Sequence, residues 1–119
     1  MKLLGSLYNI TEESDNSYTV CLDPENFIYK AHFPGEPVTP GVVIIQIAVE
    51  LLERKLGVPI RLEGISNVKF LRIINPLETP SITFSYNKIL TEEGQVKALT
   101  ELTGGENVFA KLSLICRMS

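Results

Sequence analysis

The spacing of hydrophobic residues changes along the chain and separates one helical segment from several strands. Between residues 42 and 52 apolar side chains follow one another almost without a break, and only Gln46 and Glu50 interrupt them. Elsewhere apolar and polar residues alternate, which is the period of a half-buried strand. The alternating segments are 17–22, 61–73, 81–90, 95–102 and 108–117, and a further short strand is expected around 7–10. This pattern predicts an α+β domain in which one long helix packs on an antiparallel sheet.

Start and stop signals set the limits of the predicted helix. Thr39 has the character of an N-cap, Pro40 suits the first helical position, and Gly57 followed by Pro59 ends the helix. These signals predict a helix over residues 40–56, although its β-branched residues taken alone would favour a strand. The first two turns are apolar almost all round, so the helix must be wrapped by the sheet or by a partner.

Glycine and proline mark the connections. The segments 92–94 and 104–107 have the composition of hairpin turns, so the last three strands are expected to form an antiparallel meander. Residues 31–41 contain three prolines and two glycines, which predicts a rigid, shaped loop. Since the sequence contains no internal repeat or linker, residues 1–119 are expected to form one domain.

Charge and composition narrow the class of protein. Eleven basic residues against fourteen acidic ones, with no basic run longer than Arg54-Lys55, argue against a nucleic-acid partner. No apolar segment reaches the roughly 20 residues that span a bilayer, and the N-terminus does not resemble a signal peptide, so we expect a cytoplasmic protein without a membrane partner. Cys21 and Cys116 both lie in strand-like contexts and are expected to be buried, reduced thiols. Neither a metal nor a cofactor is expected.

The only histidine heads the run His32-Phe33-Pro34-Gly35-Glu36-Pro37-Val38-Thr39-Pro40-Gly41-Val42. This run resembles the HFPGxPxxPGV signature of the 3-hydroxyacyl-acyl-carrier-protein dehydratases, the hot-dog-fold enzymes of fatty-acid synthesis. A second segment, 67–72 followed by Pro76, looks like the VKFRxPVxPGD strand and turn of that family, with Leu77-Glu78 in place of its usual Gly-Asp. The resemblance implies a hot-dog fold, in which a curved antiparallel sheet wraps a central helix.

The same resemblance implies particular partners. In the family, paired subunits align their sheets, and each site takes the histidine from one chain and a helix residue from the other. It therefore implies a homodimer, a trimer of dimers or a mixed hot-dog dimer, with acyl carrier protein bearing the acyl-phosphopantetheine substrate as the further partner.

The residues themselves suggest roles in such a site. His32 can act as the base, since imidazole accepts a proton near neutral pH. Pro40 has no N–H, so the Gly41 amide is the first free donor at the positive end of the helix dipole and can polarise a thioester carbonyl. Phe33, Pro40 and Val42 complete the substrate-binding residues that the resemblance implies.

The acid of the family is missing from its usual place. Fourteen residues after the histidine, where the family has Glu or Asp, this chain has Gln46; one turn later, where the family commonly has Gln, it has Glu50. The exchange moves the carboxylate by roughly 5–6 Å. Either Glu50 supplies the proton from one turn deeper, or His32 carries its own abstracted proton to the hydroxyl, or both helix residues belong to an ordinary polar stripe.

Three functions are compatible with this pattern. The first is dehydration of a 3-hydroxyacyl thioester to a trans-2-enoyl thioester, with His32, Gln46 and Glu50 as the candidate catalytic residues. The second is a catalytically impaired hot-dog subunit that binds acyl thioesters or completes an active partner. The third, hydrolysis of a thioester with Glu50 acting on water, is less favoured because the His-Phe-Pro-Gly loop is typical of dehydratases.

Overall fold

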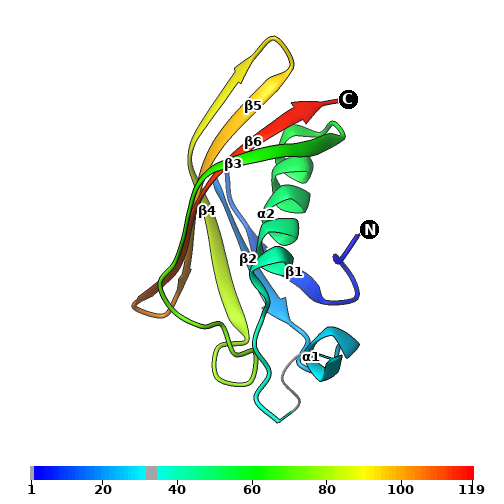
Figure 1. The fold of residues 1–119 in the computed structure, drawn as a ribbon, viewed down its shortest axis with the longest axis vertical. Coiled ribbons are helices and arrows are strands. Elements are labelled where there is room, and N and C mark those ends of the chain that lie inside the picture. Colours follow the sequence, from blue (N-terminus) through cyan, green and yellow to red (C-terminus); the bar gives the residue numbers. More distant parts are fainter. Residues whose placement is uncertain (1, 32–34) are drawn as a thin grey trace.

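A long helix lies across one face of a six-stranded sheet in the computed structural model, which describes residues 2–31 and 35–119 (Figure 1). The predicted α+β architecture is confirmed. His32 and Phe33 lie outside the described residues. The elements are β1 (Tyr8–Glu13), β2 (Ser17–Leu22), α1 (Phe27–Ala31), α2 (Gly41–Leu56), β3 (Ile60–Phe70), β4 (Ser81–Glu92), β5 (Gln95–Gly104) and β6 (Asn107–Met118).

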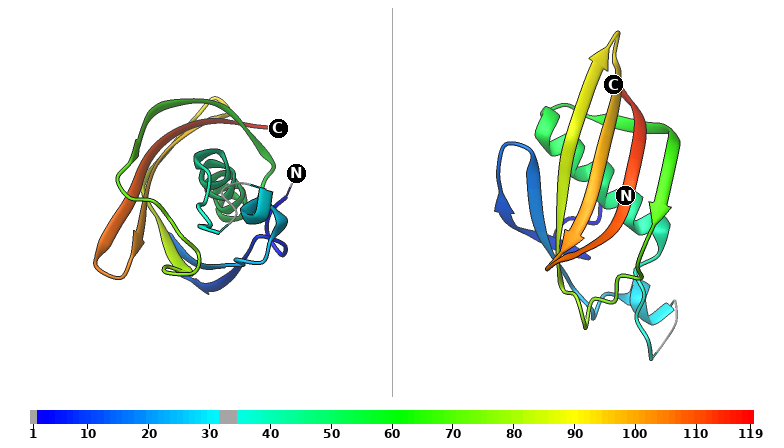
Figure 2. Two further views of the ribbon diagram at one scale, coloured as in Figure 1. Left: turned by 60° about the horizontal axis from the view of Figure 1, so that its bottom comes forward. Right: turned by 90° about the vertical axis from the view of Figure 1, so that its left-hand side faces the viewer.

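The strands follow the order β1-β2-β4-β5-β6-β3, and each neighbouring pair is antiparallel. The predicted meander of the last three strands is confirmed, and its first turn has positive φ at Glu93 and Gly94. Strand β3 pairs with β6, at the opposite edge of the sheet from β1. The left view of Figure 2 shows the sheet curving around α2, so the sheet itself provides the cover that the apolar helix requires.

The core lies between α2 and the concave face of the sheet. Ile47, Ala48 and Leu52 of the helix are almost fully buried, and alternate residues of β4, β5 and β6 face them. The hydroxyl of Tyr86, on β4, donates a hydrogen bond to the Ala48 carbonyl in the middle of the helix. In β4 and β5 the buried residues therefore follow the two-residue period of a strand, and in β6 they do so from Ala110 onward.

The start of α2 differs from the prediction. The N-cap is Pro40, whose backbone is extended, and no side chain caps the helix. Thr39 is buried instead, where its Oγ1 lies 3.0 Å from the Tyr29 hydroxyl and its N–H donates to the Ile74 carbonyl at 2.9 Å. Capping was the wrong role for Thr39 because tertiary partners engage its hydroxyl and its N–H. The helix ends as predicted at Gly57, with φ 71° and its N–H donating to the Glu53 carbonyl.

One further element and one strand boundary differ from the sequence pattern. The short helix α1 was not predicted. Asn26 precedes this helix and its Oδ1 accepts a hydrogen bond from the Ile28 N–H, so an Asn at this position is the sequence signal that could have indicated α1. Strand β3 ends at Phe70 rather than residue 73, because the Leu71 and Arg72 N–H groups both donate to the Phe109 carbonyl and regular pairing stops there.

The two cysteines are both free, but they differ in exposure. Cys116 is buried on the concave face of β6, whereas Cys21 is exposed, which corrects the expectation that both are buried. Tyr18, Val20 and Leu22 occupy the inward positions of β2, so Cys21 between them points outward.

This difference predicts selective thiol labelling. Burial raises the pKa of Cys116 to about 11, so little of this thiol is ionised at pH 8. We expect an alkylating reagent at that pH to modify one thiol of the folded protein quickly and the second only in denaturant. Intact-mass measurement before and after denaturation checks this, and Cys21→Ser should abolish the fast reaction; two fast thiols in the native protein would contradict it.

Candidate active site at the start of the central helix

The N-terminus of α2 brings the two sequence motifs together. Gly41 opens the helix, and the first intrahelical acceptor is the Pro40 carbonyl, which receives the Val43 and Ile44 N–H groups. Beside it, the end of β3 supplies Phe70 and the residues that follow. The described end of the signature and the end of the second motif, 67–72, are therefore neighbours in space, although the 24 residues 43–66 separate the two motifs in sequence.

A cavity of about 270 Å³ lies between these two segments. Its walls are mainly apolar, and Arg72 is the charged residue among them. It is lined by Val38, Thr39, Gly41, Ile44 and residues 70–74. The apolar residues around it are unusually exposed, since Val42 and Ile73 retain 76% and 70% of their accessible surface. Such a surface at a cavity mouth is typical of a binding or subunit contact.

Gly41 has a packing reason as well as the chemical one inferred from the sequence. A Cβ atom at this position would lie 2.9 Å from Cζ of Phe70, so the aromatic ring occupies the space that a side chain would need. The close approach of Phe70 therefore requires glycine here. The same ring borders the cavity into which a thioester would extend.

We expect Gly41→Ala to separate activity from stability. Alanine favours the helix by up to about 1 kcal/mol, but its methyl group must displace the half-exposed Phe70 ring, so the melting temperature should change by only a few degrees. The displaced ring should narrow the cavity and reduce thioester binding about tenfold or more. Calorimetry and equilibrium binding of an acyl-pantetheine check this, with Gly64→Ala as the control, because nothing lies within 4 Å of the position that its methyl group would take. Unchanged binding in Gly41→Ala would contradict the prediction.

Glu50 is buried and accepts four hydrogen bonds. Its Oε2 accepts the Leu3 N–H and the Gln46 Nε2 group, both at 2.8 Å, while Oε1 accepts the Leu4 N–H and the Tyr8 hydroxyl, both at 3.0 Å. The side chain is only 6% exposed. A carboxylate offers about four acceptor positions, so this one is saturated. Burial and the nearby Glu50 charge raise the pKa of Tyr8, which therefore stays a hydrogen-bond donor.

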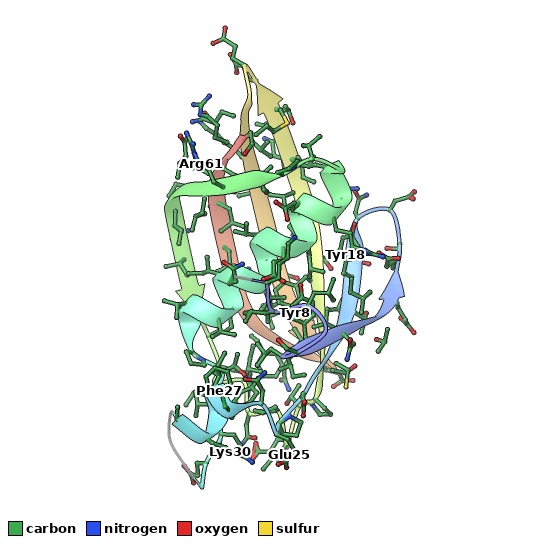
Figure 3. The ribbon with its side chains drawn as sticks, turned by 90° about the vertical axis from the view of Figure 1, so that its right-hand side faces the viewer. Tyr8, Tyr18, Glu25, Phe27, Lys30 and Arg61 are labelled. Carbon is green, nitrogen blue, oxygen red and sulfur yellow. The ribbon has the colours of Figure 1, made fainter. Side chains whose placement is uncertain are left out.

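The donors come from an N-terminal segment that the sequence did not reveal. Residues 2–7 return along the C-terminal half of α2, where Leu3 and Leu7 are buried and Lys2 forms an ion pair with Glu53. Figure 3 shows Tyr8, at the start of β1, against the middle of the helix. Apart from the apolar residues at positions 3, 4 and 7, no pattern in the sequence indicated this packing.

Val42, Gln46 and Glu50 follow one another at four-residue spacing along α2, so they share one side of the helix. Exposure falls along this row: Val42 is open, Gln46 is partly buried and Glu50 is covered by the N-terminal segment. The predicted proximity of Gln46 and Glu50 is therefore confirmed. Glu50 does not line the cavity beside Gly41, and proton transfer from Glu50 to a substrate would require one of its four donors to leave.

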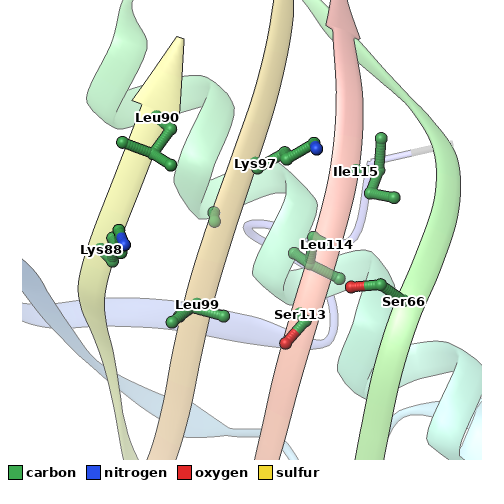
Figure 4. Close-up of a pocket in the computed structure, with 9 residues that line it drawn as sticks. Ser66, Lys88, Leu90, Lys97, Leu99, Ser113, Leu114 and Ile115 are labelled. Carbon is green, nitrogen blue, oxygen red and sulfur yellow. The ribbon is translucent and has the colours of Figure 1, made fainter.

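Another hollow lies on the opposite, convex face of the sheet (Figure 4). It has a volume of about 190 Å³ and is bordered by Lys88, Leu90, Lys97 and Leu99 together with residues of β3 and β6. Pro40, Gly41, Val42, Gln46 and Glu50 do not contribute to it. Within residues 2–31 and 35–119 no cluster of potential metal ligands occurs, and no helix there has the length and hydropathy to span a bilayer.

A long helix wrapped by a six-stranded antiparallel sheet, with a cavity at the helix N-terminus, defines a hot-dog protein. The chain aligns with the dehydratase heterocomplex ApeI:P from Xenorhabdus doucetiae with a TM-score of 0.62 and 16% identity, covering 96% of this chain and all of that one. It also aligns with a hypothetical thioesterase from Streptococcus pneumoniae solved with coenzyme A, with a TM-score of 0.64, 12% identity, and coverage of 94% and 85%. At these identities the likeness establishes the hot-dog fold.

Sequence similarity adds the family. Residues 9–104 match the ApeI-like family, described as ApeI dehydratase, so the chain belongs to this family of hot-dog dehydratases. Its relatives include the 3-hydroxyacyl-acyl-carrier-protein dehydratases FabZ of Oenococcus oeni, 29% identical over 75% of this chain and 69% of that protein, and of Latilactobacillus sakei, 30% identical over 74% and 68%. The resemblance drawn from the His32 signature is thereby confirmed.

Proposed function

We propose that this protein eliminates water from a 3-hydroxyacyl thioester carried by acyl carrier protein and releases the trans-2-enoyl thioester. The observation that carries the proposal is the position of Gly41: this residue of the dehydratase signature is the first residue of α2, beside a mainly apolar cavity suited to an acyl chain. Membership of the dehydratase family and the FabZ relatives support the same reaction.

The chemistry needs a base, a carbonyl donor and a proton for the leaving group. His32 removes a proton from C2 of the substrate, and the Gly41 N–H donates to the thioester oxygen as negative charge develops there. The C3–O bond then breaks, the C2=C3 double bond forms, and the hydroxyl departs as water once it has received a proton. Since Gln46 has no titratable proton, the proton that His32 removed from C2 is the simplest source, and Glu50 remains the alternative donor.

The exposed apolar residues at the cavity mouth support a paired site. Val42, Phe70, Leu71 and Ile73 lie around the helix N-terminus, next to the unpaired edge of β3. A second hot-dog subunit aligned there would cover them and could supply the histidine of the shared site, as either a homodimer or a unit of a trimer of dimers. Acyl carrier protein would present the acyl-phosphopantetheine from outside this pair, in the cytoplasm.

A direct assay tests the reaction. Purified protein is incubated with 3-hydroxyacyl thioesters of acyl carrier protein over a range of chain lengths, and the enoyl product is measured by mass spectrometry. We expect enoyl thioester and water to form without any added cofactor. Release of the free acid instead would favour thioester hydrolysis, and absence of any product at all chain lengths would contradict both reactions.

The position of Gln46 favours a second candidate, an impaired subunit that completes a mixed hot-dog dimer. Gln46 stands where the family has its acid, and the similar Xenorhabdus dehydratase was solved as a heterocomplex. In that case the protein alone would be inactive and would gain activity when combined with a second hot-dog subunit that carries the acid. Full activity of a homogeneous preparation, lost on His32→Ala, would exclude this candidate.

A further inference from the structure

We propose that the hollow on the convex face of the sheet binds a medium-chain fatty-acid anion, with the carboxylate at Lys88 and Lys97 and the alkyl chain on Leu90 and Leu99. This hollow is separate from the cavity beside Gly41, and the proposal does not depend on the proposed dehydration. Pairing of two subunits edge to edge would leave the convex face open, so the hollow stays accessible in such a pair.

Two β-bulges border the hollow and turn its residues outward. The register of β4 against β5 shifts between Tyr86 and Lys88, and the register of β3 against β6 shifts between Ile65 and Asn67. Tyr86 is buried on the concave face, so a regular strand would place Lys88 and Leu90 on that face as well. The bulge in β4 places both side chains on the convex face instead, where they border the hollow (Figure 4).

Four side chains of β4 and β5 alternate in chemistry around the hollow. Lys88 lies opposite Leu99, and Leu90 lies opposite Lys97, so the lysines occupy one diagonal of a square and the leucines occupy the other. Leu90 and Leu99 remain 53% and 43% exposed, which means that the aliphatic parts of the lysines leave much of the apolar surface uncovered. Such a surface suits a ligand that combines an alkyl chain with a negative head group.

The positive charge of this square has no counter-charge. Further along the same face, Lys111 forms an ion pair with Glu101. Within the described part of the chain, neither Lys88 nor Lys97 forms an ion pair. The chain as a whole is acidic, with a net charge of −3, so general composition does not explain two unmatched lysines beside one hollow. The hollow is therefore complementary to an anion.

The size of the hollow indicates which anion fits. Its volume of about 190 Å³ lies below the roughly 300 Å³ at which sites for drug-sized ligands begin. At roughly 30 Å³ for a water-sized group, it holds about six such groups, which corresponds to one short alkyl chain. A second copy of this protein is a poorer occupant, because a two-fold contact places the same patch on itself and brings lysine against lysine.

An NMR titration of the intact protein with octanoate tests the proposal. The backbone amides of Lys97 and Leu99 report on the convex hollow, and those of Gly41 and Ile44 report on the cavity at the start of α2. We expect octanoate to shift the Lys97 and Leu99 signals with a Kd of about 1 mM, as for a ligand of about ten non-hydrogen atoms. Octylammonium, which has the opposite charge, and butyrate, which has a shorter chain, should each bind about tenfold more weakly.

Substitutions separate the contributions of charge and alkyl chain. Lys88→Gln and Lys97→Gln should each weaken octanoate binding about threefold, and the double variant about tenfold. Lys111→Gln is the matched control, because it removes a lysine of the same face that already pairs with Glu101, and it should change the Kd less than about twofold. Leu99→Asn should reduce the preference for octanoate over butyrate while the preference for octanoate over octylammonium is retained.

Three results would each overturn the proposal: signal shifts confined to Gly41 and Ile44, equal binding of octylammonium, or an unchanged Kd in the double lysine variant. A second copy would be the occupant if, without octanoate, the Lys97 and Leu99 signals moved with protein concentration and sedimentation showed an increase in mass that Leu99→Asp abolished. That result would also overturn the proposal. Octanoate binding at the convex hollow is expected whether or not the protein forms an enoyl thioester, so the two proposals fail separately.

Discussion

Glu50→Ala should lower the free energy of unfolding by about 3 kcal/mol or more, a large change for a domain of 119 residues. The substitution removes an acceptor of two backbone N–H groups, the Tyr8 hydroxyl and the Gln46 amide. Each buried donor left without an acceptor costs about 1–3 kcal/mol, reduced where water enters. Urea unfolding monitored by circular dichroism measures the change.

Glu25→Ala is the control for this experiment. Glu25 also pairs with a neighbour, Lys30, but 77% of its side chain and 68% of the lysine side chain are exposed. A surface pair of this kind contributes little, so we expect a change below about 0.5 kcal/mol. An equally small decrease in the free energy of unfolding for both variants would show that the packing of the N-terminal segment does not depend on Glu50.

His32→Ala should reduce the rate of dehydration by about 10²- to 10⁴-fold, the range that a positioned general base contributes. The C2 proton of a thioester is weakly acidic, and alanine offers nothing to accept it. Because His32 is the only histidine of the chain, no second imidazole can substitute. Steady-state kinetics on the enoyl product measure the loss, and it should appear mainly in kcat.

Lys30→Ala serves as the comparison, since it removes an exposed side chain two residues before His32. It should leave kcat unchanged. A His32→Ala protein that retains wild-type activity would show that the base lies elsewhere and that the signature only shapes the loop.

Most of the fold followed from local pattern. The change of hydrophobic period located α2 and the strands, and Gly57 ended the helix as its left-handed backbone requires. Two of the exceptions share one cause. Thr39 and residues 71–72, which were expected to continue β3, bond to groups far away in sequence, and such partners override a local cap or strand signal.

The candidate site was only partly predictable, because some of its contacts also come from residues far away in sequence. The His32 signature and the 67–72 motif were recognisable in the sequence, and the structure places the described parts of both at one cavity. The surroundings of Glu50 were not recognisable, because its principal donors come from residues 3, 4 and 8, more than forty positions away. Spacing on a helix shows that Gln46 and Glu50 meet, but it does not show which neighbour covers them.

The strand order also bears on how the chain is made. Helix α2 precedes β3, β4, β5 and β6 in sequence, although the concave face of β4–β6 covers it. During synthesis the apolar surface of α2 therefore stays uncovered until β4, β5 and β6 have been made. Strand β3 likewise cannot pair until β6 has left the ribosome. Such late, non-local closure slows folding and leaves a nascent chain prone to aggregation, so the protein should depend on chaperones more than a helical bundle of equal length does.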